Sequence, residues 1–133
     1  MSVKTPNLAG QRILIVEDEV LLAHDVCASV AEAGATVTGP FHKLEDAYDA
    51  ATDARFEAAI LDVDIAGKLV FPVADLLEAK GIPFVFHTAR PESQTLRTRY
   101  TETPICGKPA ALDWLLRLLS EALPRPTVAP SKD

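Results

Sequence analysis

Short apolar runs alternate with longer segments of helical periodicity along this chain. Apolar runs that are short and continuous are typical of strands buried on both faces of a sheet. The predicted strands span residues 12–16, 35–38, 56–61, 82–87 and 104–107. The segments between them space apolar residues three or four positions apart, which predicts helices over 20–33, 44–54, 72–80 and 111–123.

This alternation defines the expected fold class. It favours an α/β fold with a doubly wound parallel five-stranded sheet and helices on both faces. Gly39 and Pro40 are expected to stop the second strand. Residues 91–102 carry almost no apolar stripe, so we expect the fourth helix to be weak or disordered. Right-handed crossovers bring the carboxyl ends of all the strands to one edge of the sheet.

The chain of 133 residues suits a single domain, which we place over residues 11–123. Residues 1–10 are expected to form a flexible N-terminal arm without a leader sequence. The Pro-rich residues 124–133 are expected to form a flexible tail, too short for an effector domain. These boundaries predict a stand-alone domain.

The charge balance narrows the classes of partner. The chain has 13 basic and 19 acidic residues and a net charge of −6, which disfavours a nucleic-acid partner. Its apolar runs are too short to cross a membrane. Cys27 and Cys106 lie in apolar contexts without the spacing of metal ligands, which predicts buried, reduced thiols. We therefore expect a cytoplasmic protein.

Polar side chains follow four of the predicted strands. Glu17 and Asp18 follow the first strand, Asp62 the third, Thr88 the fourth and Lys108 the fifth. Three carboxylates at one edge repel one another, and a hard divalent cation such as Mg²⁺ relieves that repulsion. The lysine and the threonine hydroxyl suit the oxygens of a phosphoryl group. The set predicts a carboxylate that accepts a phosphoryl group.

The residues around these polar strand ends form four motifs. They are Val16-Glu17-Asp18-Glu19, Leu61-Asp62-Val63-Asp64, Thr88-Ala89 and Lys108-Pro109. In order and spacing they resemble the receiver domain of two-component response regulators, over roughly residues 11–123. The resemblance implies a flavodoxin-like, CheY-like fold with strand order 2-1-3-4-5.

The resemblance also implies a role for each of these positions. Asp62 would be the phosphoacceptor, and Thr88 and Lys108 would contact the phosphoryl group. Mg²⁺ (or Mn²⁺) would be bound by Asp62, by Asp18 directly, by Glu17 through water, and by the backbone carbonyl of Asp64. The Lys108–Pro109 peptide would be cis.

The implied partners belong to a phosphotransfer system. A histidine kinase, a histidine phosphotransfer protein or a small acyl phosphate would donate the phosphoryl group. The output would be protein interaction, onward phosphorelay or a phosphate sink. The chain would not be an enzyme, because it would catalyse at most its own phosphorylation and dephosphorylation.

The chain departs from the usual receiver pattern at several positions. Ile105 replaces a common aromatic switch residue, and Ala110 replaces an aromatic residue after the Lys-Pro pair. Residues 83–89 are similar to the Pro-Phe-x-Phe-Ala-Thr-Gly strand of an atypical, mostly single-domain subgroup nicknamed FAT GUY. His87 and Ala89 replace the Ala and Gly of that motif, and the fourth helix of the subgroup is short or mobile.

Arg90, Ala89 and Ile105 are therefore candidate modulating residues. We hypothesise that Asp64 and Arg90 form an ion pair that slows access of the hydrolytic water. Two solvated side chains are the simpler alternative, because exposed ion pairs are weak.

Two other functions fit part of the pattern. Asp62-Val63-Asp64 also fits the Asp-x-Asp motif of haloacid-dehalogenase-type phosphatases, although that motif belongs on the first strand of their fold. A docking module with an unused acidic pocket is the third hypothesis, against which the intact set of polar strand ends argues.

Two further features concern packing. His87 is expected to pack against a helix. On the last helix, Trp114 and Leu118 lie off the leucine stripe and form a candidate homodimer or partner face.

Overall fold

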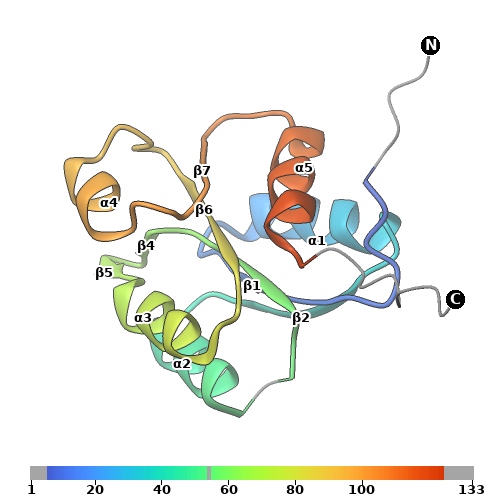
Figure 1. Ribbon diagram of the computed structural model, residues 1–133, viewed down its shortest axis with the longest axis horizontal. Coiled ribbons are helices and arrows are strands. Elements are labelled where there is room, and N and C mark those ends of the chain that lie inside the picture. Colours follow the sequence, from blue (N-terminus) through green and yellow to red (C-terminus); the bar gives the residue numbers. More distant parts are fainter. Residues whose placement is uncertain (1–5, 54, 125–133) are drawn as a thin grey trace, which may run out of the picture.

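A parallel sheet forms the centre of the molecule. The computed structural model describes residues 6–53 and 55–124. The strand order is β2-β1-β3-β6-β7, and every neighbouring pair is parallel, so the predicted fold class is confirmed (Figure 1). The strands of this sheet are β1 (Arg12–Val16), β2 (Thr36–Phe41), β3 (Ala58–Leu61), β6 (Phe84–Thr88) and β7 (Ile105–Gly107).

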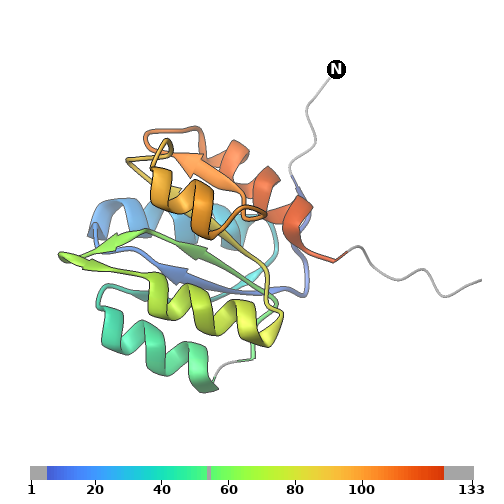
Figure 2. The same cartoon turned by 60° about the vertical axis from the view of Figure 1, so that its left-hand side comes forward.

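Five helices cover the two faces of the sheet. They are α1 (Val20–Glu32), α2 (Leu44–Asp53), α3 (Phe71–Lys80), α4 (Gln94–Arg99) and α5 (Leu112–Ala122). Helices α1 and α5 share one hydrophobic core, and α2, α3 and α4 share the other (Figures 1 and 2). Within the described ranges, none of the helices combines the length and apolar character needed to cross a bilayer.

Each central strand serves both cores because successive side chains point to opposite faces. In β1, Ile13 and Ile15 face the core of α1 and α5, whereas Leu14 and Val16 face the other core. The four residues of β3 alternate in the same way, and all four are buried. Two-sided burial explains why these strands read as continuous apolar runs in the sequence.

Strand β2 is longer than predicted. It continues through Gly39 and Pro40 to Phe41, and a register shift relative to β1 accommodates one extra residue between Thr38 and Phe41. Gly39 has a φ of 111°, and a Cβ atom there would lie 2.8 Å from the carbonyl oxygen of Ile15. The predicted stop at Gly39 and Pro40 is therefore wrong, because this edge strand absorbs the irregularity as a bulge.

The N-terminal segment is partly packed. Leu8 is fully buried in the core of α1 and α5, and its N–H donates to the carbonyl oxygen of Ala33 at 2.8 Å. The prediction of a flexible arm is wrong for this residue, which closes one end of that core. Residues 1–5 of the predicted arm and residues 125–133 of the predicted tail lie outside the described residues.

Helix α4 is short but anchored. It has six residues, and the hydroxyl of Ser93 accepts from the N–H of Leu96 at its start. Leu96 and Tyr100 are both buried in the core of α2 and α3. The helix is short. We expected it to be weak or disordered because residues 91–102 carry almost no apolar stripe, but these two buried side chains hold it against the core.

Candidate functional site

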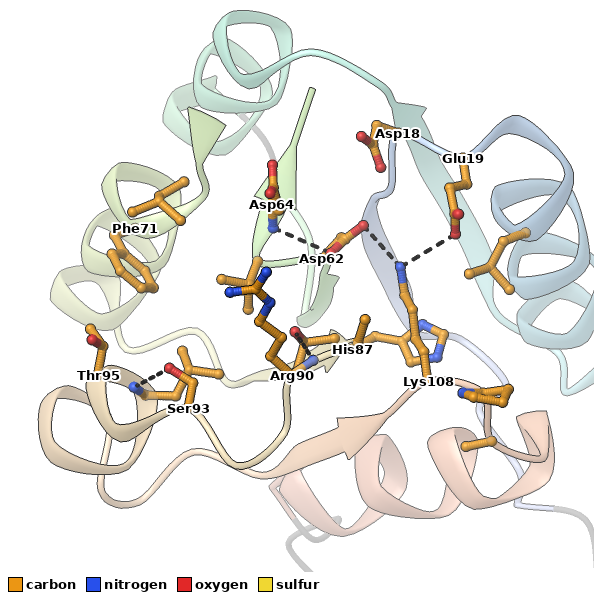
Figure 3. A pocket seen from close by; sticks show the side chains of 18 of the residues that line it. Asp18, Glu19, Asp62, Asp64, Phe71, His87, Arg90, Ser93, Thr95 and Lys108 are labelled. Atoms are coloured by element: carbon orange, nitrogen blue, oxygen red, sulfur yellow. Dashed lines mark hydrogen bonds and ion pairs between the residues drawn. The ribbon is translucent and has the colours of Figure 1, made fainter. Parts of the chain in front are cut away.

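The polar strand ends meet at one edge of the sheet. Glu17 and Asp18 follow β1, Asp62 follows β3, Thr88 ends β6 and Lys108 follows β7. Apart from Glu17, these residues line a cavity of about 930 Å³. Figure 3 shows the side chains of Asp62 and Lys108 pointing toward each other across it. The parallel topology thus brings together side chains that are up to 91 positions apart in the sequence (17 to 108).

Three carboxylates form a compact cluster in this site. Glu17, Asp18 and Asp62 each offer an oxygen atom, and these atoms lie within 4.8 Å of one another. Glu17 is 2% exposed and Asp62 is 6% exposed. Hard oxygen donors at this spacing fit a divalent cation such as Mg²⁺, which prefers carboxylates and water as ligands.

The ammonium group of Lys108 bridges two of these acids. Its Nζ lies 2.8 Å from Oε1 of Glu17 and 2.9 Å from Oδ2 of Asp62. Glu19 contributes a third, longer contact of 3.7 Å. The backbone N–H of Lys108 donates to the carbonyl oxygen of Thr88 at 2.7 Å, and the Lys108–Pro109 peptide is cis. The Lys108 ammonium group, whose side chain is largely buried, therefore contacts three acidic side chains.

Burial shifts the pKa values of the groups in this cluster. Desolvation, followed by the hydrogen bond with Asp62, raises the pKa of Glu17 to about 8, although Lys108 acts in the opposite direction. Desolvation also raises the pKa of Asp62. Desolvation lowers the pKa of Lys108, but its hydrogen bonds with Glu17 and Asp62 outweigh that effect and raise it. Burial thus disfavours negative charge on both acids at once, and the contacts with Lys108 offset this only in part.

A small hairpin that the sequence analysis missed supports two of the acids. Strands β4 (Asp64–Ile65) and β5 (Lys68–Leu69) pair antiparallel around Ala66 and Gly67, whose φ values are 52° and 85°. The N–H of Ala66 donates to Oδ2 of Asp18 at 2.8 Å, and the N–H of Asp64 donates to Oδ1 of Asp62 at 3.3 Å. A glycine in a two-residue loop was the available signal.

Thr88 and Arg90, at the carboxyl end of β6, also line the cavity. Thr88 is buried, and its Oγ1 accepts from the N–H of Arg90 at 3.0 Å. The guanidinium of Arg90 points into the cavity (Figure 3). Among the ion pairs of the described residues, none joins Arg90 to Asp64, so the hypothesised pair is not formed in this structure. The Asp64 carboxylate instead accepts from the N–H of Gly67.

The other candidate modulating residues occupy different environments. Ala89 is exposed and lines the cavity, whereas Ile105 packs against the core of α2 and α3. The sequence analysis did not assign the wall of the cavity formed by Ser93, Thr95 and Leu96 at α4.

His87 is a buried neutral histidine in this site. It is 2% exposed, and its Nδ1 has no hydrogen-bond partner among the residues that the structure describes. Desolvation, with a smaller contribution from the charge of Lys108, lowers its pKa to about 4. A charged imidazolium is therefore disfavoured at neutral pH.

Comparisons with known proteins place this geometry in context. No family model and no curated protein matches the sequence. Solved structures do match. The response regulator PhyR from Brucella abortus has 28% identity and a TM-score of 0.76, over 90% of this chain and 50% of that one. The HemR receiver domain from Leptospira biflexa has 25% identity and a TM-score of 0.75, over 87% of this chain and 98% of that one.

A third neighbour is similar in fold. It is the receiver domain of the sensor histidine kinase PA1611 from Pseudomonas aeruginosa, with 22% identity and a TM-score of 0.74, over 86% of this chain and 98% of that one. That structure has a magnesium ion coordinated in its active-site cleft. These solved structures are receiver domains or contain one, and this chain shares their fold. The chain has the fold of a response-regulator receiver domain, as its sequence motifs predict, and it spans about half the length of PhyR.

The buried histidine generates a prediction on acid stability. As the pH falls from about 6.5 to about 4, the unfolded chain binds a proton that folded His87 does not, so the folded state loses stability. Replacing His87 with Leu should make the free energy of unfolding fall less steeply over this window. Urea denaturation at several pH values measures the slope.

A matched variant isolates the effect of burial. His24 has an 81% exposed side chain, so His24→Leu should keep the wild-type slope. Equal slopes for His87→Leu and the wild type would show that His87 titrates normally in the folded protein.

Proposed function

We propose that this chain is an Mg²⁺-dependent phosphorylation switch in two-component signal transduction, with Asp62 as its phosphoacceptor. The observation that carries the proposal is the position of the Asp62 carboxylate. It lies within 4.8 Å of two further acids and 2.9 Å from Lys108, at the lip of a cavity. The receiver-domain neighbours favour this function over that of a dehalogenase-type phosphatase.

The transfer step uses one carboxylate oxygen of Asp62. This oxygen forms a bond to phosphorus, and the bond from phosphorus to the donor breaks. For a phosphohistidine donor, the leaving group is imidazole, which takes up one proton. The Lys108 ammonium is hydrogen-bonded to Asp62 and would stabilise charge on the transferred group, and the buried Thr88 hydroxyl would donate a hydrogen bond to it from the neighbouring strand β6.

The proposed metal site consists of the carboxylates of Glu17, Asp18 and Asp62. The resemblance of the sequence to receiver domains implies the backbone carbonyl of Asp64 as a further ligand. Mg²⁺ bound there would neutralise the carboxylates and the oxygens of the phosphoryl group. Two features of the chain prepare this site. The N–H of Ala66 holds the Asp18 carboxylate by a hydrogen bond, and Glu17 and Asp62 are buried acids, whose ionisation a bound cation would favour.

The proposed donors are a histidine kinase or a histidine phosphotransfer protein, and the output is protein binding, onward phosphotransfer or a phosphate sink. The outer face of α5 is the proposed dimer or partner face. Trp114 is 49% exposed there, and Leu118 is partly buried beside it.

Replacing the phosphoacceptor tests the proposed function. Incubation with acetyl phosphate and Mg²⁺ should add one phosphoryl group to the wild type and none to Asp62→Asn, because the amide is not a nucleophile at this position. Intact mass spectrometry measures the gain. Asp49→Asn, an exposed acid on α2, should be phosphorylated like the wild type. A phosphoryl group on Asp62→Asn would contradict the assignment.

The metal site makes a separate prediction. Asp18→Asn should weaken Mg²⁺ binding by about tenfold or more, because it removes one of three clustered carboxylates. Isothermal titration calorimetry measures the affinity, with Asp49→Asn as the control of equal charge change. Unchanged Mg²⁺ affinity in Asp18→Asn would place the metal elsewhere.

A further inference from the structure

Helix α4 is too short to be stable by itself. It has six residues, well below the roughly 12 to 15 that isolated helices need in water. Its position therefore depends on contacts with the rest of the fold. Two residues supply the apolar part of these contacts, because Leu96 and Tyr100 are buried at its middle and its end.

One carboxylate on the neighbouring helix supplies the polar part. The hydroxyl of Tyr100 donates to Oδ1 of Asp75 at 2.7 Å. The guanidinium of Arg99 donates to Oδ2 of the same residue at 2.6 Å. Both oxygens of Asp75, on α3, are thus engaged by consecutive residues at the end of α4. The Tyr100 hydroxyl sits at the end of an otherwise buried ring, where loss of its acceptor is costly.

Aromatic packing connects this contact with the strand that carries Thr88. The ring of Tyr100 lies 5.1 Å from that of Phe86 and 5.4 Å from that of Phe71, centroid to centroid. Phe86 precedes Thr88 by two residues on β6, so the two side chains leave the strand on the same face. The Arg99 guanidinium lies 4.7 Å from the centre of the Phe71 ring.

Helix α4 and the loop before it also form a wall of the cavity that contains Asp62. Arg90, Ser93, Thr95 and Leu96 line the cavity on this side. The loop is short and tied at both ends. Arg90 donates its N–H to Thr88, and Ser93 donates its N–H to the carbonyl oxygen of Arg90. A shift of α4 therefore displaces the groups that face Asp62.

We propose that Asp75 and Tyr100 are positioning residues that hold the α4 wall and the Thr88–Arg90 loop over Asp62. The latch itself, defined as the Asp75, Arg99 and Tyr100 contacts, follows from the geometry alone. Its effect on phosphoryl transfer rests on the proposed function. Because neither side chain lines the cavity, both residues act through α4 and not on the reacting atoms.

The first arm of the test measures the latch by amide hydrogen exchange. Tyr100→Phe and Asp75→Ala should raise the exchange rates of the Arg97 and Tyr100 amides, which close α4, by about tenfold. Asp75→Asn keeps an acceptor for the Tyr100 hydroxyl and should restore part of the protection that Asp75→Ala loses. Tyr48→Phe is the matched control, because Tyr48 is 42% exposed on α2. Its α4 amides should exchange like those of the wild type.

The second arm measures the reaction at Asp62. Phosphorylation by acetyl phosphate should slow by about tenfold in Tyr100→Phe, because misplaced groups near a reacting atom are costly. Mg²⁺ affinity should stay at the wild-type value, because the clustered acids follow β1 and β3. A purely global loss of stability would instead raise exchange in all elements.

Each contrary result has a distinct meaning. Exchange at α4 in Tyr100→Phe equal to that in Tyr48→Phe would overturn the latch. Faster exchange at α4 with an unchanged phosphorylation rate would overturn the positioning role. A wild type that accepts no phosphoryl group would overturn the proposed function, and the exchange experiment would still decide whether Asp75 holds α4.

Discussion

The ammonium group of Lys108 between Glu17 and Asp62 is the contact on which the site depends. These side chains come from three strands, and the two acids are almost completely buried. Without a cation, two buried carboxylates in contact cannot both stay charged. The contact therefore requires that β1, β3 and β7 end at the same edge of the sheet, and the parallel arrangement of the strands meets this requirement.

The rest of the fold meets this requirement through two-sided burial. Strands β1 and β3 place alternate residues in two separate cores, so neither strand can slip by one residue without exchanging its faces. The register fixed in this way pairs Val16 with Leu61, and the acids follow directly after both strands. The positions of the acids at the sheet edge thus depend on the apolar side chains of β1 and β3, which fix the register of these strands.

The sequence was informative wherever an apolar run led directly into a polar residue. The positions of Glu17, Asp62, Thr88 and Lys108 at one edge followed from strand prediction and the geometry of parallel sheets. The family resemblance added the expected strand order. Local signals were enough because β1, β3, β6 and β7 each have a functional residue at or directly after their carboxyl end.

Features that depend on distant partners were not predictable in this way. The hydroxyl of Tyr100 is bonded to Asp75, which lies 25 positions earlier in the chain. The sequence of residues 91–102 contains no signal that predicts this partner. The continuation of β2 past Gly39 depends on a register shift against β1. The expected ion pair of Asp64 and Arg90 is not formed. The Asp64 carboxylate instead accepts a hydrogen bond from the N–H of Gly67, which is only three positions away in the same hairpin.

The most direct test of the central claim is chemical mapping of the phosphorylated residue in the wild type. Borohydride reduces an aspartyl phosphate to homoserine, and peptide mass spectrometry then locates the reduced residue. Our account predicts reduction at Asp62 alone, and only after incubation with both acetyl phosphate and Mg²⁺. Reduction at Asp18, Asp64 or another acid, with Asp62 intact, would contradict it.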